Sequence, residues 1–344
     1  MSRDNIRALA LFSGGLDSIL SCRVIMEQGI EVIAVRYVTP FFGYELLARE
    51  KEYAAETREK YGIDLLLRDV SGKYLAMLGN PPHGYGKNFN PCVDCKILLA
   101  AESRAMMHEI GASFIISGEV LGQRPMSQRR DTLRVIERDS GCEDLLLRPL
   151  CARNMTETLP ERIGMVDRGR LHGFSGRSRA PQIELAASFG ITDFPSPAGG
   201  CVLTDPILAA RIAAFYQRSR AVSVSDARLL QIGRHYYLPG GGWLVMGRDE
   251  GENSKILALG EPGDLVLETV DWPGPSGLLR GGTVDDHERA AGLLIRFSRK
   301  GTGRSGASVA LKKISTNGNA VQVETAKVPP LSDQLFEEIA HPKR

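Results

Sequence analysis

Residues 8–18 read ALALFSGGLDS, and this stretch decides the fold of the first half of the chain. Ala8–Phe12 has the length and composition of a buried strand, and a stretch with helical spacing begins at Leu16. Gly14 and Gly15, which lie between them, allow a sharp turn. A strand, a glycine turn and the amino end of a helix together predict an anion site, because backbone amides and the helix dipole point at it.

The first half of the chain continues this alternation of strand and helix. Strands are predicted at 31–39, 64–70, 113–119 and 145–150, and helices at 45–61 and 95–110. Strands separated by helix-length segments indicate βαβ units, so we expect an α/β fold with a doubly wound parallel sheet. Ligands of such sheets bind outside the carboxyl ends of the strands. Residues 73–91, rich in glycine and proline, are predicted to form a long loop.

After about residue 205 the sequence changes, first to a helical stretch and then to short predicted strands separated by glycine turns. We predict a catalytic domain over 1–205, a helical connector over 206–225 and a smaller α+β domain over 226–344. The formal net charge of +2 excludes a strongly polybasic protein, so a nucleic-acid partner would need a local basic patch. No signal peptide is visible and no apolar run reaches ~18–20 residues, so we expect a cytoplasmic protein that does not enter a membrane.

The hexapeptide SGGLDS at 13–18 predicts a nucleotide site. Its glycine amides and the hydroxyls of Ser13 and Ser18 can bind the phosphates of ATP. Asp17 would repel a phosphate unless Mg²⁺ lay between them, so we assign Asp17 a catalytic role through the metal or through the orientation of the loop. The loop lacks the lysine of a Walker motif, which excludes a P-loop kinase or GTPase. An ordinary glycine turn is the structural alternative.

The hexapeptide SGG-x-DS is the signature of the PP-loop ATP pyrophosphatases, and the chain resembles this class of adenine nucleotide alpha hydrolase-like proteins. Its members cleave ATP between the α- and β-phosphates and adenylate a substrate oxygen. VRYVTPFFGYELLAREKEYA, SGEVLGQRPMSQRRDTLRVIE and LLLRPL resemble the catalytic domain of tRNA 4-thiouridine synthetases, and NPCVDC is similar to a cysteine segment of tRNA 2-thiouridylases. The resemblance covers roughly residues 7–205. It implies that Arg36, Gly118 and Gln123 lie near the nucleotide.

Cys92 and Cys95 form a C-x-x-C pair at the predicted start of a helix, where the dipole should lower the pKa of both thiols. Cys201 follows a glycine pair near the end of the domain. In one reading the three cysteines are catalytic residues and ligands of a [4Fe–4S] cluster, as in cluster-dependent tRNA thiolases. In a second, one cysteine carries a persulfide that another resolves. In a third they bind zinc, with His83 as the nearest fourth ligand.

The other three cysteines are given no function. Cys22 is expected to be buried, whereas Cys142 and Cys151 could be exposed.

Arginines gather in two segments, at 124–138 and at 164–179. Guanidinium groups match the geometry of phosphate, so these segments predict a channel for an RNA backbone. The alternative is a solvated helix face paired with Asp131 and Glu137. The residues predicted to bind RNA here are Arg124, Arg129, Arg130 and Arg177.

The second domain has its own resemblance. IGRHYY, a glycine turn and LVMGRDEGEN resemble the RNA-binding domain of the NFACT proteins of ribosome quality control. The resemblance implies that Arg234 and Arg248 bind RNA. Tyr236, Tyr237 and Trp243 could stack on bases or form a hydrophobic core.

Together with the SGGLDS loop and the cysteines, these resemblances imply an ATP-dependent tRNA sulfurtransferase. The carbonyl oxygen of a uridine attacks the α-phosphate of ATP and expels pyrophosphate, and sulfur from the cysteine site then displaces AMP. The sulfur would come from a donor such as a cysteine desulfurase or free sulfide. Two alternatives stay open: a PP-loop ligase that acts on a small molecule, and a non-catalytic RNA-binding iron–sulfur protein.

Overall fold

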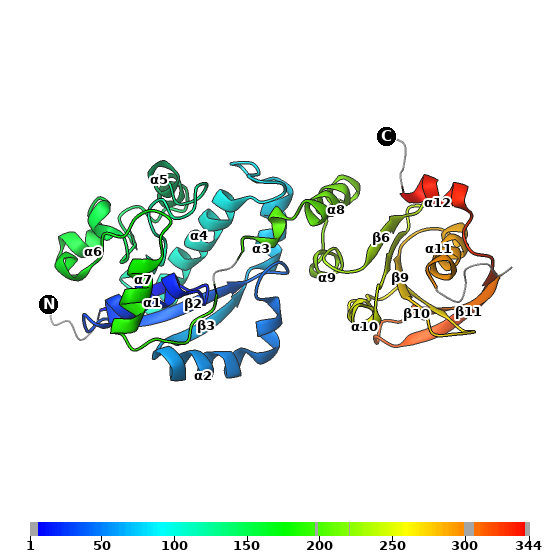
Figure 1. Cartoon of the computed structure of the whole chain (residues 1–344), viewed down its shortest axis with the longest axis horizontal. Coiled ribbons are helices and arrows are strands. Elements are labelled where there is room, and N and C mark those ends of the chain that lie inside the picture. The colour runs from blue at the N-terminus through cyan, green and yellow to red at the C-terminus, as the bar shows by residue number, and fades with distance from the viewer. Residues whose placement is uncertain (1–5, 197–198, 220, 299–305, 341–344) are drawn as a thin grey trace. The chain divides into compact units, whose positions relative to one another are not determined.

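The chain divides into two compact units, Met1–Tyr216 and Gln217–Arg344 (Figure 1). The computed structural model describes residues 6–196, 199–219, 221–298 and 306–340. The division falls within 206–225, the segment for which a connector is expected. That segment contains helix α8, Pro206–Arg218, and the start of helix α9, Val224–Leu229.

A five-stranded parallel sheet forms the centre of the first unit, in the order β3-β2-β1-β4-β5. The order reverses between β1 and β4, so the predicted doubly wound sheet is confirmed and its switch point lies beside the end of β1. The elements are β1 (Arg7–Leu11), α1 (Leu16–Met26), β2 (Glu31–Val38), α2 (Glu50–Tyr61), β3 (Asp64–Asp69), α3 (Ser71–Gly79), α4 (Cys92–Ile110), β4 (Phe114–Ser117), α5 (Arg130–Asp139), β5 (Leu146–Leu147), α6 (Leu159–Arg162) and α7 (Ala180–Ser188).

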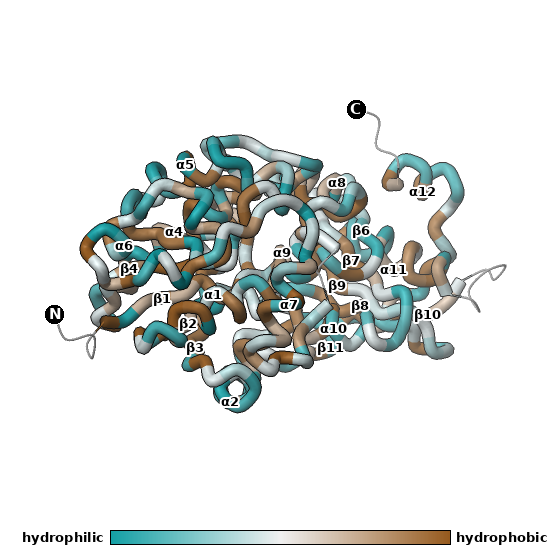
Figure 2. The backbone as a smooth tube through the Cα atoms, turned by 60° about the vertical axis from the view of Figure 1, so that its left-hand side comes forward, coloured by the Kyte–Doolittle hydropathy of each residue, from teal (hydrophilic) through white to brown (hydrophobic). Residues whose placement is uncertain are grey.

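Helices cover both faces of this sheet, because its strands are apolar on both faces. In β1, Ala8 and Ala10 pack with residues of α1, α2 and α7. Leu9 points to the opposite face and packs against α4. Next to it α4 and α5 enclose Ile115 of β4. Figure 2 shows α2 mostly in the colours of polar residues, as expected for a helix with one face in solvent.

Two predictions of secondary structure need correction. Residues 71–79 form helix α3 and belong to no loop; the loop is 80–91. Tyr74, Leu75 and Leu78 share its buried face. This helical spacing of apolar residues is short and has glycines at both ends, so the sequence favoured a loop. The predicted helix 45–61 is two pieces, a 3₁₀ turn over Tyr44–Arg49 and then α2.

The second unit is built on a six-stranded antiparallel sheet, in the order β11-β10-β8-β9-β7-β6. Helix α11 packs on the sheet with Ala290, Leu293 and Leu294 in the core, which confirms a smaller α+β domain. Among the described residues, no helix has the length and apolar character needed to cross a bilayer. The elements are β6 (Arg234–Tyr237), β7 (Trp243–Met246), α10 (Glu250–Leu257), β8 (Leu265–Thr269), β9 (Ser276–Arg280), α11 (Val284–Phe297), β10 (Ala307–Ile314), β11 (Ala320–Val328) and α12 (Asp333–Ala340).

Candidate active site

The SGGLDS loop lies at the carboxyl end of β1 and leads into α1. Gly14 has a φ of +78°, a left-handed conformation that favours glycine. The Ser18 hydroxyl donates to the carbonyl of Gly15 at 2.7 Å, and the amide of Gly15 donates to the Ser13 hydroxyl at 3.3 Å. These bonds fix the turn at the amino end of an eleven-residue helix, where an anion is stabilised.

Gly118, at the end of β4, lies directly against this loop. A Cβ placed on Gly118 would come within 2.5 Å of the Asp17 carbonyl oxygen and 2.6 Å of the Ser18 amide nitrogen. Both neighbours are backbone atoms that cannot move without distorting the loop. The two sides of the switch point therefore meet in backbone contact, which only glycine allows.

Arg36 reaches the other side of the loop from β2. A Cβ on Gly14 would collide with the guanidinium of Arg36 and lie 2.9 Å from the Tyr53 hydroxyl. The guanidinium carbon is 5.2 Å from the centre of the Tyr53 ring, and one of its nitrogens donates to the Tyr53 hydroxyl. The structure thus holds a cation beside Gly14, where phosphate is expected.

A chain of side-chain amides ends on Asp17. The Gln123 amide nitrogen donates to Asp17 Oδ2 at 2.8 Å, and the Gln182 amide nitrogen donates to Gln123 Oε1 at 3.2 Å. Asp17 Oδ1 and Gln182 Oε1 are buried and have no protein partner. An ionised carboxylate only accepts hydrogen bonds, so Asp17 sets the direction of the chain and keeps Oδ1 available for a ligand. The sequence analysis missed Gln182. The feature that could have indicated it is a single glutamine on the buried face of α7.

We expect a Gln182→Glu variant to bind MgATP about 10- to 100-fold more weakly, the usual effect of losing a residue that orients a metal ligand. A glutamate would turn the Gln123 amide toward itself and present an oxygen to Asp17, which repels it. Isothermal titration with ATP at several Mg²⁺ concentrations measures the effect.

Gln28→Glu is the matched control for this variant. Gln28 is also buried, and it bonds to the backbone of Asp167, remote from Asp17 in the hydrogen-bond network. Equal losses of MgATP affinity in the two variants would contradict a positioning role for Gln182.

A buried network of ion pairs links β4 to the start of α4. Arg148, 2% exposed, pairs with Glu119 at 2.9 Å and with Glu137, and Lys96 also pairs with Glu119. Burial alone would raise the pKa of Glu119, but the charges of Lys96 and Arg148 outweigh it and lower the pKa to about 2. The carboxylate of Glu119 is therefore paired with two cations. It joins the strand behind the loop to the residue after Cys95.

The three cysteines approach one another. Cys92 and Cys95 lie on the first turn of α4, and Cys201 lies in the segment before α8. Burial, followed by the charges of Cys92 and Cys201, raises the pKa of the Cys95 thiol to about 12. Tyr74 on α3 is 1% exposed, and its hydroxyl hydrogen bonds to the same thiol. The predicted lowering of this pKa is therefore wrong for Cys95, because burial outweighs the helix dipole.

Three thiols are suitable donors for an iron–sulfur cluster. In the part of the chain that the structure describes, however, no group of three or more histidine, cysteine or acidic side chains is arranged to hold a metal ion. Cluster binding would need the three thiols to move together and to lose their protons.

The cysteine site and the nucleotide loop are joined through consecutive residues. Gln123 bonds to Asp17, and Arg124 follows it. Burial raises the pKa of the Cys201 thiol, and Arg124 is close enough for its charge to oppose this rise. The two consecutive residues Gln123 and Arg124 therefore lie near the SGGLDS loop and Cys201, respectively.

His83 is already bound on both sides of its ring. Nδ1 lies 2.8 Å from Asp94 and Nε2 lies 3.0 Å from Asp139. Both nitrogens are therefore occupied, and His83 does not serve as the fourth ligand of a zinc site. Its contact with Asp94, which lies between Cys92 and Cys95, ties the 80–91 loop to the start of α4.

The other cysteines are buried. Cys22, Cys142 and Cys151 are each 0% exposed, so the expected exposure of Cys142 and Cys151 is wrong. The Cys142 thiol donates to the carbonyl of Ala100 at 3.4 Å, and the Cys151 thiol donates to that of Glu119 at 3.3 Å. Both fill the core beneath the site.

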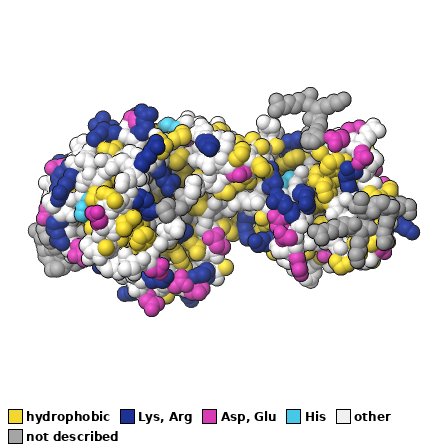
Figure 3. Space-filling model, viewed as in Figure 1, with side chains coloured by type: hydrophobic (Ala, Val, Ile, Leu, Met, Phe, Trp, Pro, Cys, Tyr) yellow, Lys and Arg dark blue, Asp and Glu magenta, His cyan; other side chains and the backbone are white. Residues whose placement is uncertain are grey.

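Four of the arginines predicted to bind RNA belong to the first unit, and two belong to the second. Arg124, Arg129, Arg130 and Arg177 are exposed on the first unit, and Figure 3 shows basic side chains over α5. Arg129 pairs with Asp131 at 3.1 Å, and Arg130 donates to the carbonyl of Asn154. In the second unit, Arg234 lies over the Phe297 ring, and Arg248 donates to the carbonyl of Gly233 at 2.8 Å.

Two aromatic residues of the second unit belong to its core. Trp243 is 4% exposed and Tyr236 is 8% exposed. The Trp243 indole donates to His235 Nδ1 at 3.2 Å, and Tyr236 packs near Phe297 and Phe336. Neither ring is available to stack on a base, so for these two residues the structure favours the alternative of a hydrophobic core.

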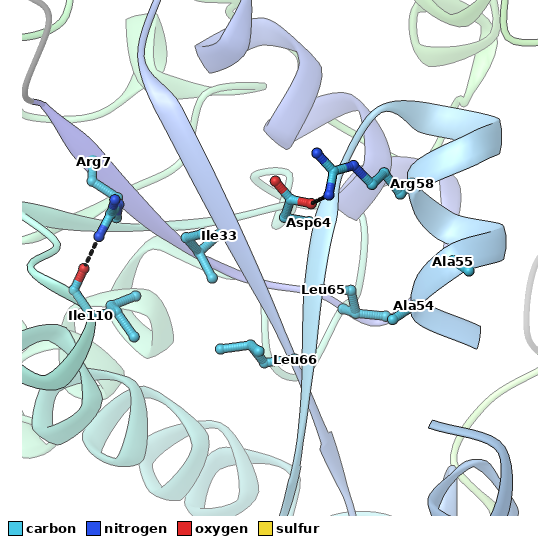
Figure 4. Close-up of a pocket in the computed structure, with 9 residues that line it drawn as sticks. All are labelled: Arg7, Ile33, Ala54, Ala55, Arg58, Asp64, Leu65, Leu66 and Ile110. Carbon is cyan, nitrogen blue, oxygen red and sulfur yellow. Dashed lines mark hydrogen bonds and ion pairs between the residues drawn. The ribbon is translucent and has the colours of Figure 1, made fainter. Parts of the chain in front are cut away.

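A cavity of about 560 Å³ lies at the opposite end of the sheet (Figure 4). Its walls include Ile33 and Leu66, and Arg58 and Asp64 form an ion pair of 3.1 Å beside it. Arg7 points to the carbonyl of Ile110. The cavity lies at the amino ends of the strands, so it is no part of the candidate active site.

Two family models match separate parts of the chain. Residues 5–170 match the family described as "Thiamine biosynthesis protein (ThiI)". The predicted resemblance is confirmed. The ThiI-like part includes the SGGLDS loop, Gln123 and two of the three cysteines. Residues 233–338 match "NFACT protein RNA binding domain", which confirms the second resemblance.

The ThiI-like part is also similar to curated proteins. A "Probable tRNA sulfurtransferase" of Methanothermobacter thermautotrophicus is 31% identical over 169 residues, which cover 47% of this chain and 41% of that protein. A "tRNA-specific 2-thiouridylase MnmA" of Bartonella quintana is 26% identical, covering 40% of this chain and 37% of that protein. The chain thus spans about two fifths of the length of these relatives. A solved "4-thiouridine synthetase - RNA complex with bound ATP" has a TM-score of 0.41 and 19% identity, covering 65% of this chain and 52% of that one.

Proposed function

We propose that this chain is an ATP-dependent tRNA sulfurtransferase that converts a uridine to a thiouridine. The observation that carries the proposal is the segment 118–124, which packs on the phosphate loop at Gly118, bonds to Asp17 through Gln123 and brings Arg124 close to Cys201. An activating site and a thiol site on one short segment suit a reaction in which activation and sulfur transfer follow each other. The names of the curated relatives agree with this chemistry.

The first step in this proposal is adenylation of the base. Ser13, Gly14, Gly15 and Ser18 hold the phosphates, with the Arg36 guanidinium beside them. Asp17 Oδ1 is the oxygen that would hold Mg²⁺, which would neutralise charge on the leaving pyrophosphate. The uridine carbonyl oxygen attacks the α-phosphorus, and the bond to pyrophosphate breaks. The base then carries AMP as a leaving group.

The second step replaces that oxygen with sulfur. A sulfur nucleophile attacks the activated carbon, the bond to the AMP oxygen breaks, and a carbon–sulfur double bond remains. We propose that Cys92, Cys95 and Cys201 hold this sulfur as ligands of a [4Fe–4S] cluster, which would supply it as bound hydrosulfide. A persulfide on one cysteine, resolved by another as a disulfide, is the second candidate and needs a reductant after each turnover. Iron and sulfide assays on anaerobically purified protein separate these candidates.

RNA-stimulated pyrophosphate release tests the proposed function. We expect release to require an unmodified tRNA transcript as well as ATP and Mg²⁺, because the uridine oxygen is the attacking group. Release stimulated by a small carboxylic acid or amide in place of RNA would favour a PP-loop ligase. A protein that binds RNA but cleaves no ATP would favour the non-catalytic alternative.

We assign RNA recruitment to both units, on the basis of the NFACT match and the exposed arginines of the first unit. A variant that replaces Arg129 and Arg130 with alanine should bind tRNA more weakly, and the slope of log affinity against log salt should fall by about two, one for each lost phosphate contact. Filter binding across a salt series measures this slope.

Arg162→Ala is the control for that variant. Arg162 is an exposed arginine on α6 that is paired with Asp144. An unchanged slope in the Arg129 and Arg130 variant would remove these residues from the RNA surface.

A further inference from the structure

The loop between α3 and α4 displays a ladder of aromatic rings. The Tyr85 and Phe89 rings stack with centres 4.3 Å apart and planes at 29°. The Phe89 ring continues to Tyr216 on α8, at 5.9 Å and 31°. Tyr85 is 39% exposed, so one end of the ladder is open to solvent.

Hydrogen bonds hold the outer rings of this ladder in place. The Tyr85 hydroxyl donates to the carbonyl of Leu78 at 2.7 Å, and the Tyr216 hydroxyl donates to that of Leu75 at 2.9 Å. Both acceptors belong to α3. A ring that is already fixed loses little freedom when a flat ligand stacks on it, so the ladder is prepared for such a ligand.

The ladder is attached to both cysteine segments. On one side, His83 binds Asp94 between Cys92 and Cys95. On the other, the Asn88 amide donates to the carbonyl of Thr204 at 2.6 Å, and the Thr204 hydroxyl donates to that of Cys201 at 2.6 Å. The exposed ring and the three thiols therefore belong to one local assembly.

Exposed cationic residues belong to the segments around this ring. Lys87 is exposed two residues after Tyr85, and Arg124 is exposed two residues before Met126. A Cβ on Gly86 would come within 2.8 Å of Met126 Cε, so the Arg124 segment packs against the loop. An exposed aromatic ring flanked by cations is how proteins hold unpaired nucleotides, with the base on the ring and the phosphates on the cations.

We propose that Tyr85 stacks an unpaired base of the RNA substrate and holds it next to the cysteine site. This inference rests on the proposed function, since it takes RNA as the substrate. It adds a base-binding position outside the nucleotide loop. Stacking is tolerant of sequence, so Tyr85 would serve any base that leaves its helix at this point.

Fluorescence of a single-stranded oligouridine that contains one 2-aminopurine tests the inference on the full chain. Stacking on a tyrosine quenches this base, so wild-type protein should quench it on binding. Tyr85→Leu should bind about 5- to 150-fold more weakly and lose the quenching, the range that corresponds to removing one stacked base. Tyr85→Phe keeps the ring and should retain both. Leu159→Ala removes an equally exposed side chain on α6 and should change neither.

The outcomes separate the two proposals. If wild-type protein binds no RNA, the proposed function fails, and the inference fails with it. If wild-type protein binds and quenches but Tyr85→Leu behaves identically, the inference alone is wrong. A second measurement needs no variant: RNA that contains 4-thiouridine is irradiated with wild-type protein, and the crosslinked peptide is identified by mass spectrometry. We expect a peptide that contains Tyr85; crosslinks confined to other segments of the first unit would overturn the inference.

Discussion

A Cys201→Ser variant should lose thiolation activity by a factor on the order of 10³ or more, the scale of effect seen when an essential nucleophile is removed. A serine hydroxyl neither carries sulfur nor binds iron as a thiolate does, so the second step has no sulfur source. Cys92→Ser and Cys95→Ser should show the same loss. In the proposed mechanism, activation of the base uses other residues, so RNA-stimulated pyrophosphate release should persist in all three variants.

Cys142→Ser is the matched control for these variants. The Cys142 thiol is buried and donates to the carbonyl of Ala100, a bond that a serine hydroxyl can also make. Thiolation by this variant should remain near the wild-type rate. Thiouridine content of the RNA, measured by mass spectrometry of digested nucleosides, and pyrophosphate release are followed in parallel. Undiminished thiolation by all three cysteine variants would rule out the cysteine site as the source of sulfur.

An Arg148→Met variant should lower the free energy of unfolding by about 3–5 kcal/mol, because it leaves Glu119 and Glu137 with an uncompensated buried charge. Arg148 is 2% exposed, so water cannot replace the lost partner. Chemical denaturation of the first unit, followed by circular dichroism, measures the change. In Arg162→Met, an exposed pair with Asp144 is broken, and the unfolding midpoint should hardly move.

The pH dependence of stability gives a second view of the same network. The pKa of Glu119 is about 2 in the folded protein, below the ordinary 4.5. Its contribution to stability is therefore complete above pH 4.5 and is lost as the pH falls toward 2. Arg148→Met should weaken this loss, because the folded pKa of Glu119 rises when one of its two cations is removed. If the free energy of unfolding of the variant falls with pH as steeply as that of the wild type, the low pKa of Glu119 depends on Lys96 alone.

The sequence was informative wherever a local pattern dictates geometry. The apolar run at 8–12 and the glycine pair after it predicted β1, the turn and α1, and the turn lies at the switch point because parallel strands share their carboxyl edge. The helix predicted at 95–110 is α4, which begins three residues earlier, at Cys92. Gly118 was placed near the nucleotide by resemblance, but its reason, backbone contact with Asp17, needed the structure.

Contacts between distant residues were the part that local patterns could not supply. Gln182 reaches Asp17 through Gln123, and neither separation in sequence nor hydropathy indicates such a contact. Arg148 stands in the apolar run LLLRPL, and its partners Glu119 and Glu137 became visible only in the structure. The pKa of Cys95 was predicted in the wrong direction because burial depends on α3, a helix that the glycine-rich sequence concealed.

Sulfur incorporation by the purified chain is the most direct test of the account. Protein prepared without oxygen is incubated with ATP, Mg²⁺, sulfide and an unmodified tRNA transcript, and the digested nucleosides are analysed by mass spectrometry. We predict a thiouridine formed in step with AMP and pyrophosphate, and no thiouridine when ATP is omitted. Release of AMP and pyrophosphate at the same rate with and without RNA, and no thiouridine in the RNA, would contradict it.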